Sequence, residues 1–597
     1  MELTNATDVM ELLVVDALKS IAKRAGISKT IRRKGELIEA LNHFIETDPA
    51  RFVQELAPTE RSFLAEAVHN NNRVSPVMFS AKYQVECPRP SRSYKSASLL
   101  DMVIASESRS KDFYVPETVA DRLRPLLEKP ESPTPATIAV VPDLYDPGSR
   151  GGGLDRMQER PIHIHRGEQT AFLELRRTLK LVQAGKVRIQ PKICRPTTAT
   201  ERVLAASLAE PDFDLELPEQ DAASYSLKSG PVRAHAWAVL VQQCGWCQAS
   251  GETLKLTRDG ELLLQQTSPE AFREGIERFG SDNDFDELRR VNNIKGQTGK
   301  ARRWMSQPSE RREKILAALA EWPVNEWMDF EEAYRFLKAC GHKFAVAAYS
   351  SILYLGEQHY GEIYDDAGLN RQYLRVLLFE SLATLGLIDV AYVYPHFLWP
   401  ELGGGGATGE LDFCGRYDGL LYVRLNPLGA YCLGHTDDYA PPAAERRALF
   451  VVLANREIAV TDHTQLRQGD IAMLELFARK EGDHLWRMDK PRILDFLEAG
   501  GSLDEISGFL SDNSTQEIPV LIRGWFNDLQ AKTRMIVNLD EAWLVEFQEA
   551  SAAALVACDS KAGRLCVLAG ERHVAVTKAN ERAFRTAIKK LGYVLPR

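Results

Sequence analysis

Cysteine is scarce and scattered in this chain, with nine cysteines spread over 597 residues. They form no framework of the kind that staples small secreted domains, and scattered thiols are typical of a reducing compartment. Long hydrophobic runs are also missing, since no stretch approaches the roughly 18 apolar residues of a membrane helix. The short apolar run Leu12–Val15 has no basic segment before it, unlike a signal peptide. We therefore expect a cytoplasmic protein with no membrane partner.

Complete catalytic and metal-binding motifs are absent as well. Gly296–Lys300 has the look of a phosphate-binding loop, but its glycines are too close together and Ala301 follows the lysine. Asp540-Glu541 mimics a helicase Walker B box, whose carboxylates hold the magnesium of a bound nucleoside triphosphate. Without a phosphate-binding loop, nothing binds that triphosphate. Cys244 and Cys247 have the spacing of a redox pair or half a zinc site, but no second pair accompanies them. We expect two buried thiols there, and no metal, cofactor or catalytic residue in the chain.

Three further features have weak functional readings. His163 and His165 alternate in an expected strand, and without a nearby carboxylate at matching spacing we expect an exposed strand edge. The glycine-rich segment 403–409 lacks the strand-to-helix context of a phosphate site, so a flexible wing or hairpin tip is the better interpretation. Asp412 and Asp418 follow it, and a metal-dependent nuclease around them stays open as the enzyme alternative.

What the chain does contain is ordinary globular composition, with 44% hydrophobic and 26% charged residues. The chain is longer than one hydrophobic core can accommodate, so its length predicts three to five domains of about 100–200 residues each. The net charge is -9. A protein that coats nucleic acid with its whole surface would be basic, so any such binding must come from local patches.

Apolar spacing predicts helices joined to short strands. Residues 12–45 read as two short amphipathic helices. From residue 168 onward an apolar helix, a glycine-containing turn and two short strands recur, which is the layout of winged-helix domains. The expected helices are Ala171–Val182, Trp237–Gln243 and Tyr373–Leu385, and the expected strands are Lys186–Ile193, Leu254–Thr257, Leu262–Leu264 and Leu421–Leu425.

Positive charge gathers in the N-terminal helix pair, where no acid stands between Lys19 and Lys34. The candidate nucleic-acid contacts there are Lys19, Lys23, Arg24, Lys29, Arg32, Arg33 and Lys34. Clustered cations neutralise phosphates and release counterions, which drives nucleic-acid affinity. Segment 18–41 resembles the SAP motif and the N-terminal helix-loop-helix of Rho terminators, although it lacks the second glycine usual in SAP loops. A solvated hairpin used as a docking tab is the alternative.

Two later basic clusters have the same potential. The first contains Arg176, Arg177, Lys180, Lys186, Arg188, Lys192 and Arg195, and the second contains Arg289, Arg290, Lys295, Lys300, Arg302, Arg303, Arg311 and Arg312. Trp304 lies inside the second cluster and could stack on a base. From it we select Lys300, Arg302 and Arg303 as contacts. A flexible basic linker is an equal alternative.

The last 150 residues resemble the N-terminal domain of XPB-type helicases and the bacterial helicase-associated proteins that share it. The resemblance rests on segment 481–488, an expected helix over 490–499, a glycine pair, a second helix from Ser502, and a third opened by Ile518-Pro519. We expect Trp486, Phe496, Phe509, Trp525 and Trp543 as core anchors. The resemblance implies work beside a helicase, and the family's motor is absent.

We therefore predict an α+β, mostly helical, multidomain chain that is not an enzyme. The expected domains are a basic hairpin (1–50), a helical segment with a Pro/Gly-rich linker (51–167), winged-helix-like regions (168–310 and 311–440) and a helicase-associated α/β domain (441–597). The expected function is a DNA-binding accessory protein that positions DNA for, or recruits, a separate helicase or nuclease. The alternative is a protein-interaction scaffold whose winged helices serve as docking surfaces.

Overall fold

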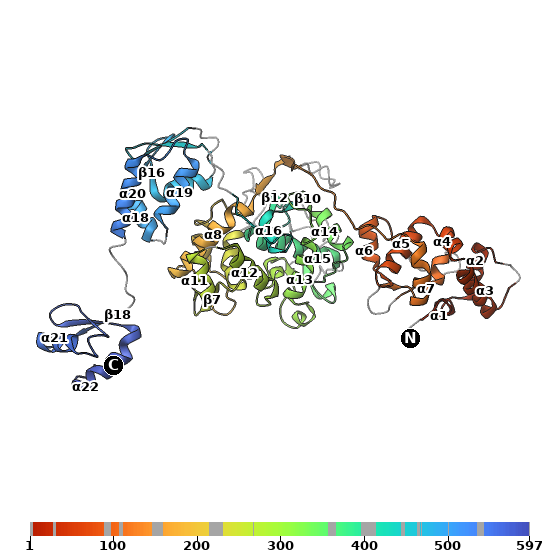
Figure 1. Ribbon diagram of the computed structural model, residues 1–597, viewed down its shortest axis with the longest axis horizontal. Coiled ribbons are helices and arrows are strands. Elements are labelled where there is room, and N and C mark those ends of the chain that lie inside the picture. The colour runs from red at the N-terminus through yellow and green to blue at the C-terminus, as the bar shows by residue number, and fades with distance from the viewer. Residues whose placement is uncertain are drawn as a thin grey trace. The chain divides into compact units, whose positions relative to one another are not determined.

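The computed structural model describes residues 4–27, 31–88, 97–106, 112–145, 159–213, 231–266, 268–355, 366–395, 414–442, 448–461, 466, 468–498, 501–533 and 542–595. The fold is α+β and mostly helical, as predicted (Figure 1). The chain forms two compact units. The first comprises Met1–Glu445, Thr464–Arg479 and Asp489–Gly501, and the second comprises Arg446–His463, Lys480–Met488 and Ser502–Arg597.

The first unit begins with seven helices around one core. They are α1 (Ala6–Glu11), α2 (Val15–Arg24), α3 (Lys34–Thr47), α4 (Pro49–Glu55), α5 (Pro58–His69), α6 (Pro76–Tyr83) and α7 (Glu117–Leu123). The predicted helix pair is confirmed as α2 and α3, which bury their apolar faces. The same core takes in Phe63 of α5 and Leu123 of α7, so it extends across the expected boundary at residue 50.

A segment without helices follows. Residues 128–143 contain only an isolated bridge, in which the Ile138 amide donates to the Trp327 carbonyl at 2.9 Å. The glycines 151–153 of the expected linker lie outside the described residues.

Next comes a group of three helices and a hairpin, α8 (Gly167–Gln183), α9 (Thr198–Ala205), α10 (Arg233–Gln243), β7 (Cys247–Ser250) and β8 (Thr253–Leu256). The expected strand 186–193 is reduced to isolated bridges at Arg188 and Ile189, and the Leu254 amide donates to the Val187 carbonyl. The predicted strand Leu262–Leu264 is wrong. It lies in helix α11 (Arg258–Gln265), because the Thr257 hydroxyl caps the Gly260 amide and starts a helix. Helix α12 (Pro269–Ser281) follows.

The same order recurs with α13 (Pro308–Leu319), β10 (Trp327–Asp329), α14 (Phe330–Ala339), α15 (Asp366–Val376), β12 (Ile388–Tyr392) and β13 (Leu420–Leu425). Helix α15 continues as a π-helix over Leu377–Leu382, which confirms the helix predicted over 373–385 in all but its last residue, Leu385. With β6 (His163–His165) the strands form an antiparallel sheet in the order β10-β13-β12-β6. Helices α16 (Pro427–Cys432), α17 (Gln468–Phe477) and α18 (Lys490–Glu498) complete the described α-helices of the first unit.

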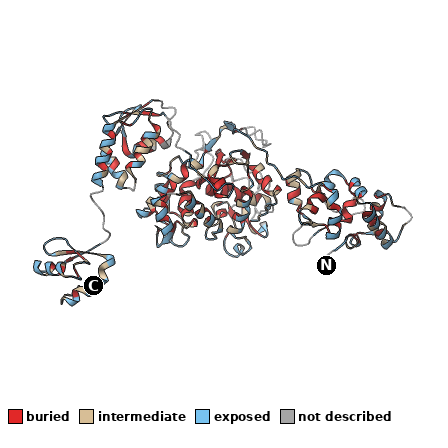
Figure 2. Ribbon diagram, in the orientation of Figure 1, coloured by how far each residue is buried: buried red, intermediate tan, exposed pale blue. Residues whose placement is uncertain are grey.

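One core joins both groups, from Ala171 to Cys432. The third helix of each group, α10 and α15, contributes its apolar residues to this core. Figure 2 shows buried residues gathered inside this part of the chain. Helix α10 has no exposed residue, and in α15 only Asp366 is exposed. Neither helix therefore presents a free face to solvent.

The second unit begins with antiparallel strands β14 (Phe450–Val452), β15 (Glu457–Val460) and β17 (Leu485–Met488), followed by α19 (Leu503–Asn513) and α20 (Val520–Thr533). A separate small core lies between β18 (Ala542–Glu546), α21 (Ala550–Cys558), β19 (Val567–Leu568), β20 (His573–Thr577) and α22 (Glu581–Lys590). Trp486 is buried as expected, and Phe496, Phe509 and Trp525 are partly buried. Trp543 is 48% exposed, so its assignment to the core is wrong.

Candidate nucleic-acid interface

The N-terminal helix pair presents three unengaged cations. Lys23 and Arg24 lie at the C-terminal end of α2, and Arg32 lies just before α3. All three side chains are exposed, and none forms an ion pair within the described residues. Lys29, which was predicted with them, lies outside those residues. The three are therefore available to a phosphate.

The other predicted cations of this helix pair have partners. Lys19 lies 3.4 Å from Asp16, and Arg33 lies 3.8 Å from Glu36. These exposed pairs contribute little and yield readily to a ligand. Lys34 donates from Nζ to the carbonyl oxygen of Glu11 at 2.7 Å and so ties α3 to α1. Lys34 is thus partly a structural residue.

The cluster over 289–312 divides into structural and free arginines. Arg290 donates to Glu380 at 2.9 Å, Arg311 to Asp286 at 2.8 Å and Arg312 to Glu287 at 2.6 Å. The Arg311 and Arg312 side chains are 1% and 0% exposed. A flexible basic linker is therefore wrong for this segment, and these three arginines are not available to nucleic acid. Glu380 stands 90 residues from Arg290, so neighbouring sequence does not reveal the pairing.

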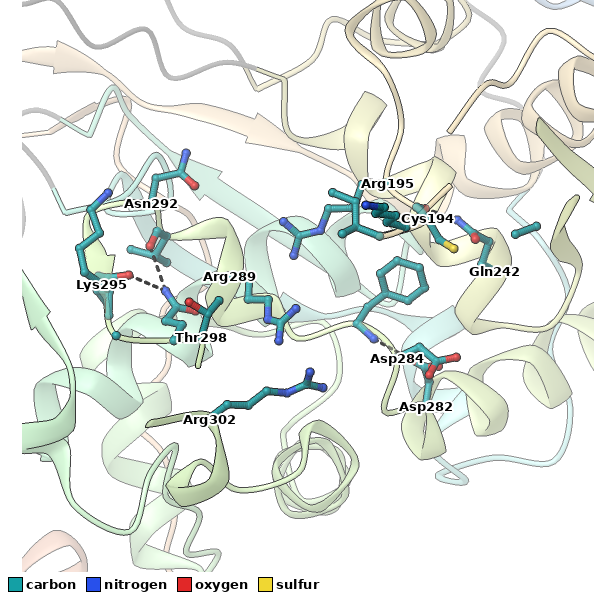
Figure 3. Close-up of a pocket in the computed structure, with 18 of the residues that line it drawn as sticks. Cys194, Arg195, Gln242, Asp282, Asp284, Arg289, Asn292, Lys295, Thr298 and Arg302 are labelled. Carbon is teal, nitrogen blue, oxygen red and sulfur yellow. Dashed lines mark hydrogen bonds between the residues drawn. The ribbon is translucent and has the colours of Figure 1, made fainter. Parts of the chain in front are cut away.

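Five other cations of the two late clusters line one cavity of about 880 Å³ (Figure 3). They reach it from the loop before α9, from the 3₁₀ helix Glu287–Arg290, from strand β9 (Ile294–Lys295) and from the 3₁₀ helix Ala301–Trp304. The five lining cations are Lys192, Arg195, Arg289, Lys295 and Arg302. We call them the cavity cations. Sequence reasoning selected only Arg302 among them, because nothing in the sequence brings residues 192–195 next to 289–302.

Hydrogen bonds fix the backbone on both sides of the cavity. On one side, Cys194 has a left-handed φ of 53°, and its carbonyl oxygen accepts from Gln242 Nε2 at 3.0 Å. On the other, Gln297 Nε2 donates to the Ile294 carbonyl at 2.7 Å. Gly296 has φ +87°, and a Cβ there would lie 2.5 Å from the Ile352 carbonyl oxygen. This glycine of the apparent phosphate loop therefore serves a tight turn.

The cavity cations are not balanced by carboxylates. None of them forms an ion pair within the described part of the chain, and only Asp282 and Asp284 add negative charge to the lining. Asp282 already accepts from Gln243 Nε2 at 3.0 Å and lies 3.8 Å from Arg312. In Figure 3 the side chains of Arg195, Arg289 and Arg302 extend into one open space. The arrangement concentrates positive charge at a concave surface.

Like charges act on each other within this cavity. Burial lowers the pKa of Arg195, and the positive charges of Arg290 and Arg289 lower it further. The guanidinium stays charged at neutral pH, because an ordinary arginine pKa lies so far above it. An anion placed between these groups would relieve their mutual repulsion.

A smaller chamber of about 20 Å³, enough for one water, adjoins Arg195. His235 lines it, and its Nδ1 lies 2.8 Å from Glu201 Oε1. Burial, followed by the charges of Arg290, Arg195 and Arg416, lowers the pKa of His235 well below its usual range. The imidazole is therefore neutral, and its Nε2 has no hydrogen-bond partner within the described residues.

The other singled-out side chains have structural positions. Cys244 and Cys247 are buried thiols, as predicted, and no group of three metal-ligating side chains occurs among the described residues. His165 is buried on edge strand β6, with Nδ1 2.9 Å from Glu210, so the expected exposed edge is wrong for this residue. Asp418 is buried in a turn, where its carboxylate accepts the amides of Cys414 and Gly415. Asp412 and the glycines 403–409 lie outside the described residues.

Arg303, Trp304 and Lys300 lie beside the cavity without lining it. Trp304 is 44% exposed, and the Arg303 guanidinium lies over its ring at 5.5 Å from the centroid. Lys300 and Arg303 are exposed. An exposed ring flanked by cations offers a stacking surface for an unpaired base.

Comparisons with known proteins assign no family. No protein-family model matches the chain, and no curated protein matches it. Within the described residues, no helix has the length and apolar character needed to span a bilayer.

Proposed function

We propose that this chain is a DNA-binding accessory protein, without a motor or catalytic centre of its own, that positions DNA for a separate helicase or nuclease. The observation that carries the proposal is the set of five cavity cations, none of which forms an ion pair within the described residues. Unpaired arginines and lysines on a concave surface are the electrostatic footprint of phosphate binding. Lys23, Arg24 and Arg32 add a second cationic surface in the same unit.

The order of elements supports a winged-helix interpretation. In both groups, a helix, a short extended segment, two further helices and two antiparallel strands follow one another, and the extended segment pairs with the last strand. This is the helix-turn-helix-and-wing layout. The resemblance of residues 481–529 to the XPB-type N-terminal domain favours a helicase as the partner.

The mode of binding follows from the buried third helices. A helix-turn-helix protein reads sequence by laying this helix in the major groove, which α10 and α15 cannot do with their surfaces inside the core. Strand β7 of the wing instead lines the cavity through Gln248 and Ala249. We therefore propose contacts to the phosphate groups of DNA rather than to base edges, and such contacts position a protein without specifying sequence.

A salt series tests the proposal. Fluorescence anisotropy would measure affinity for duplex, forked and single-stranded DNA, and each lost phosphate contact should reduce the slope of log affinity against log salt by roughly 0.7–0.9. The variant Lys23→Glu/Arg24→Glu/Arg32→Glu removes three such contacts and should bind more weakly, with a slope flatter by roughly 2–3. Arg122→Glu is the matched control, because Arg122 already faces Glu46 at 3.8 Å. Absence of binding at low salt would refute the proposal.

A protein-interaction scaffold is the second candidate, and the buried third helices favour it. A winged-helix domain whose third helix packs in the core, instead of binding DNA, can serve as a surface that binds other proteins. Purification with a stoichiometric protein partner and no affinity for any DNA would decide for it.

A further inference from the structure

The cavity has the dimensions of a small-molecule site rather than of a duplex track. Its volume of about 880 Å³ falls within the range of pockets that enclose ligands of drug or nucleotide size. A duplex spreads its phosphates along a rod, with one charge per roughly 1.7 Å of axis. A compact cavity with five cations suits a ligand whose negative charge is concentrated on one group.

The donors in the cavity match a terminal phosphate. Arg195, Arg289 and Arg302 each carry a planar fork of N–H groups, which binds phosphate oxygens in pairs. A phosphate monoester has about -1.5 to -2 charges and three strongly accepting oxygens, whereas a diester within a strand has one charge. Three guanidinium groups facing one space therefore fit the monoester better.

The remaining lining suits the nucleoside attached to such a phosphate. Phe285 offers an aromatic ring, and Asn292 offers an amide that can both donate and accept. Gln242 Nε2 already donates to the Cys194 and Ala238 carbonyls, so Gln242 offers its Oε1 as an acceptor. The hydrogen bond from Gln242 to the Cys194 carbonyl also fixes the loop that carries Arg195. The same side chain would therefore contact the ligand and position Arg195.

We propose that this cavity binds a phosphate monoester, namely the phosphorylated end of a nucleic-acid strand. The inference rests on the proposed DNA-binding function and specifies which part of the DNA the cavity takes. A free mononucleotide carries the same phosphate, and the experiment separates the two sources.

The test compares strands that differ only at their ends. Short single strands with a 5′-phosphate or a 5′-hydroxyl, labelled at the 3′ end, are titrated with the full chain by anisotropy. A second pair carries a 3′-phosphate or a 3′-hydroxyl. We expect one phosphorylated end to bind roughly tenfold or more tightly than its hydroxyl counterpart, the gain expected from one or two charge-assisted hydrogen bonds.

Neighbouring arginines provide the discriminating variants. Arg302→Gln should abolish the preference for the phosphorylated end, because Arg302 lines the cavity. Arg303→Gln should weaken both strands alike and keep the preference, because Arg303 lies outside the lining. Arg258→Gln removes another exposed arginine, at the start of α11, and should change neither quantity. Equal thermal midpoints for all variants would show that each is folded.

The outcomes separate the two proposals. Equal affinity for phosphorylated and hydroxyl ends, or equal effects of Arg302→Gln and Arg303→Gln on the preference, would overturn the inference and leave DNA binding intact. Binding of a mononucleotide or inorganic phosphate, lost in Arg302→Gln, with no affinity for any strand, would overturn the strand end as the ligand and the DNA-binding function with it. No binding of any of these probes would refute both proposals.

Discussion

Arg312 of α13 should be one of the most sensitive positions in the chain. Its guanidinium is fully buried and donates to Glu287 Oε1 at 2.6 Å. It also donates to three backbone carbonyls, those of Phe279, Asp282 and Phe285, at 3.1, 2.5 and 2.8 Å. These contacts fix the segment that carries Asp282, Phe285 and Arg289 into the cavity.

Arg312→Met should destabilise the first unit by about 3–5 kcal/mol. The methionine fills part of the arginine volume, but it leaves the Glu287 carboxylate buried with the Tyr373 hydroxyl, at 2.9 Å, as its remaining described partner. Breaking a buried ion pair by removing one member costs about this much, because the orphaned charge stays out of water. Urea unfolding followed by tryptophan fluorescence should show the midpoint reduced by roughly 1 M, because a unit of this size has a steep dependence of stability on urea.

Two further variants test whether the buried charge causes this loss of stability. Lys314→Met removes a cation from the same helix, but its pair with Glu313 is half exposed, so it should cost less than about 1 kcal/mol. Arg312→Met/Glu287→Gln removes both charges and should be more stable than Arg312→Met alone. If Arg312→Met shifts the midpoint no more than Lys314→Met, the assignment of Arg312 as a buried structural cation is wrong.

Other perturbations have equally definite outcomes. Because the pKa of His235 is lowered well below 6.5, the folded state binds fewer protons than the unfolded state, and stability should fall as the pH drops below about 6.5. His235→Gln should flatten that fall in urea midpoints measured across pH. Gly429→Ala should destabilise by about 1–3 kcal/mol, since its Cβ would meet the Leu387 carbonyl at 2.0 Å. Gly524→Ala in α20, with open space around it, should be neutral or stabilising. Thermal melts of the two glycine variants would measure both effects. Asp418→Asn should lower the thermal midpoint, because a neutral amide replaces the carboxylate that accepts the Cys414 and Gly415 amides.

Local patterns predicted much of the secondary structure. The apolar spacing of residues 12–45 identified α2 and α3, and the run over 373–385 identified α15 with its π-helical continuation. The prediction of a strand at Leu262–Leu264 was wrong because three consecutive leucines fit the apolar repeat of a helix as well as that of a strand. The Thr257 cap, four residues before Glu261, decided for the helix.

The cavity could not be predicted in the same way, because its two halves are distant in sequence. Arg195 and Arg302 stand more than a hundred residues apart, and the packing of α8, α10 and α12 into one core brings their segments together. The clustering of basic residues along the sequence did indicate both segments. It did not indicate which members face the same space.

What separates a binding arginine from a structural one is the position of the acids. Arg290, Arg311 and Arg312 each form an ion pair with a buried or half-buried carboxylate. Arg195, Arg289 and Arg302 form none within the described residues, although Asp282 and Asp284 share their cavity. Acids are not in short supply, since the chain has 83 aspartates and glutamates against 74 lysines and arginines. Some arginines of this segment are paired with acids, whereas their neighbours face one another across the cavity. The guanidinium groups facing the cavity repel one another, and a bound anion would remove that repulsion. This contrast, more than the number of basic residues, supports a phosphate ligand at the cavity.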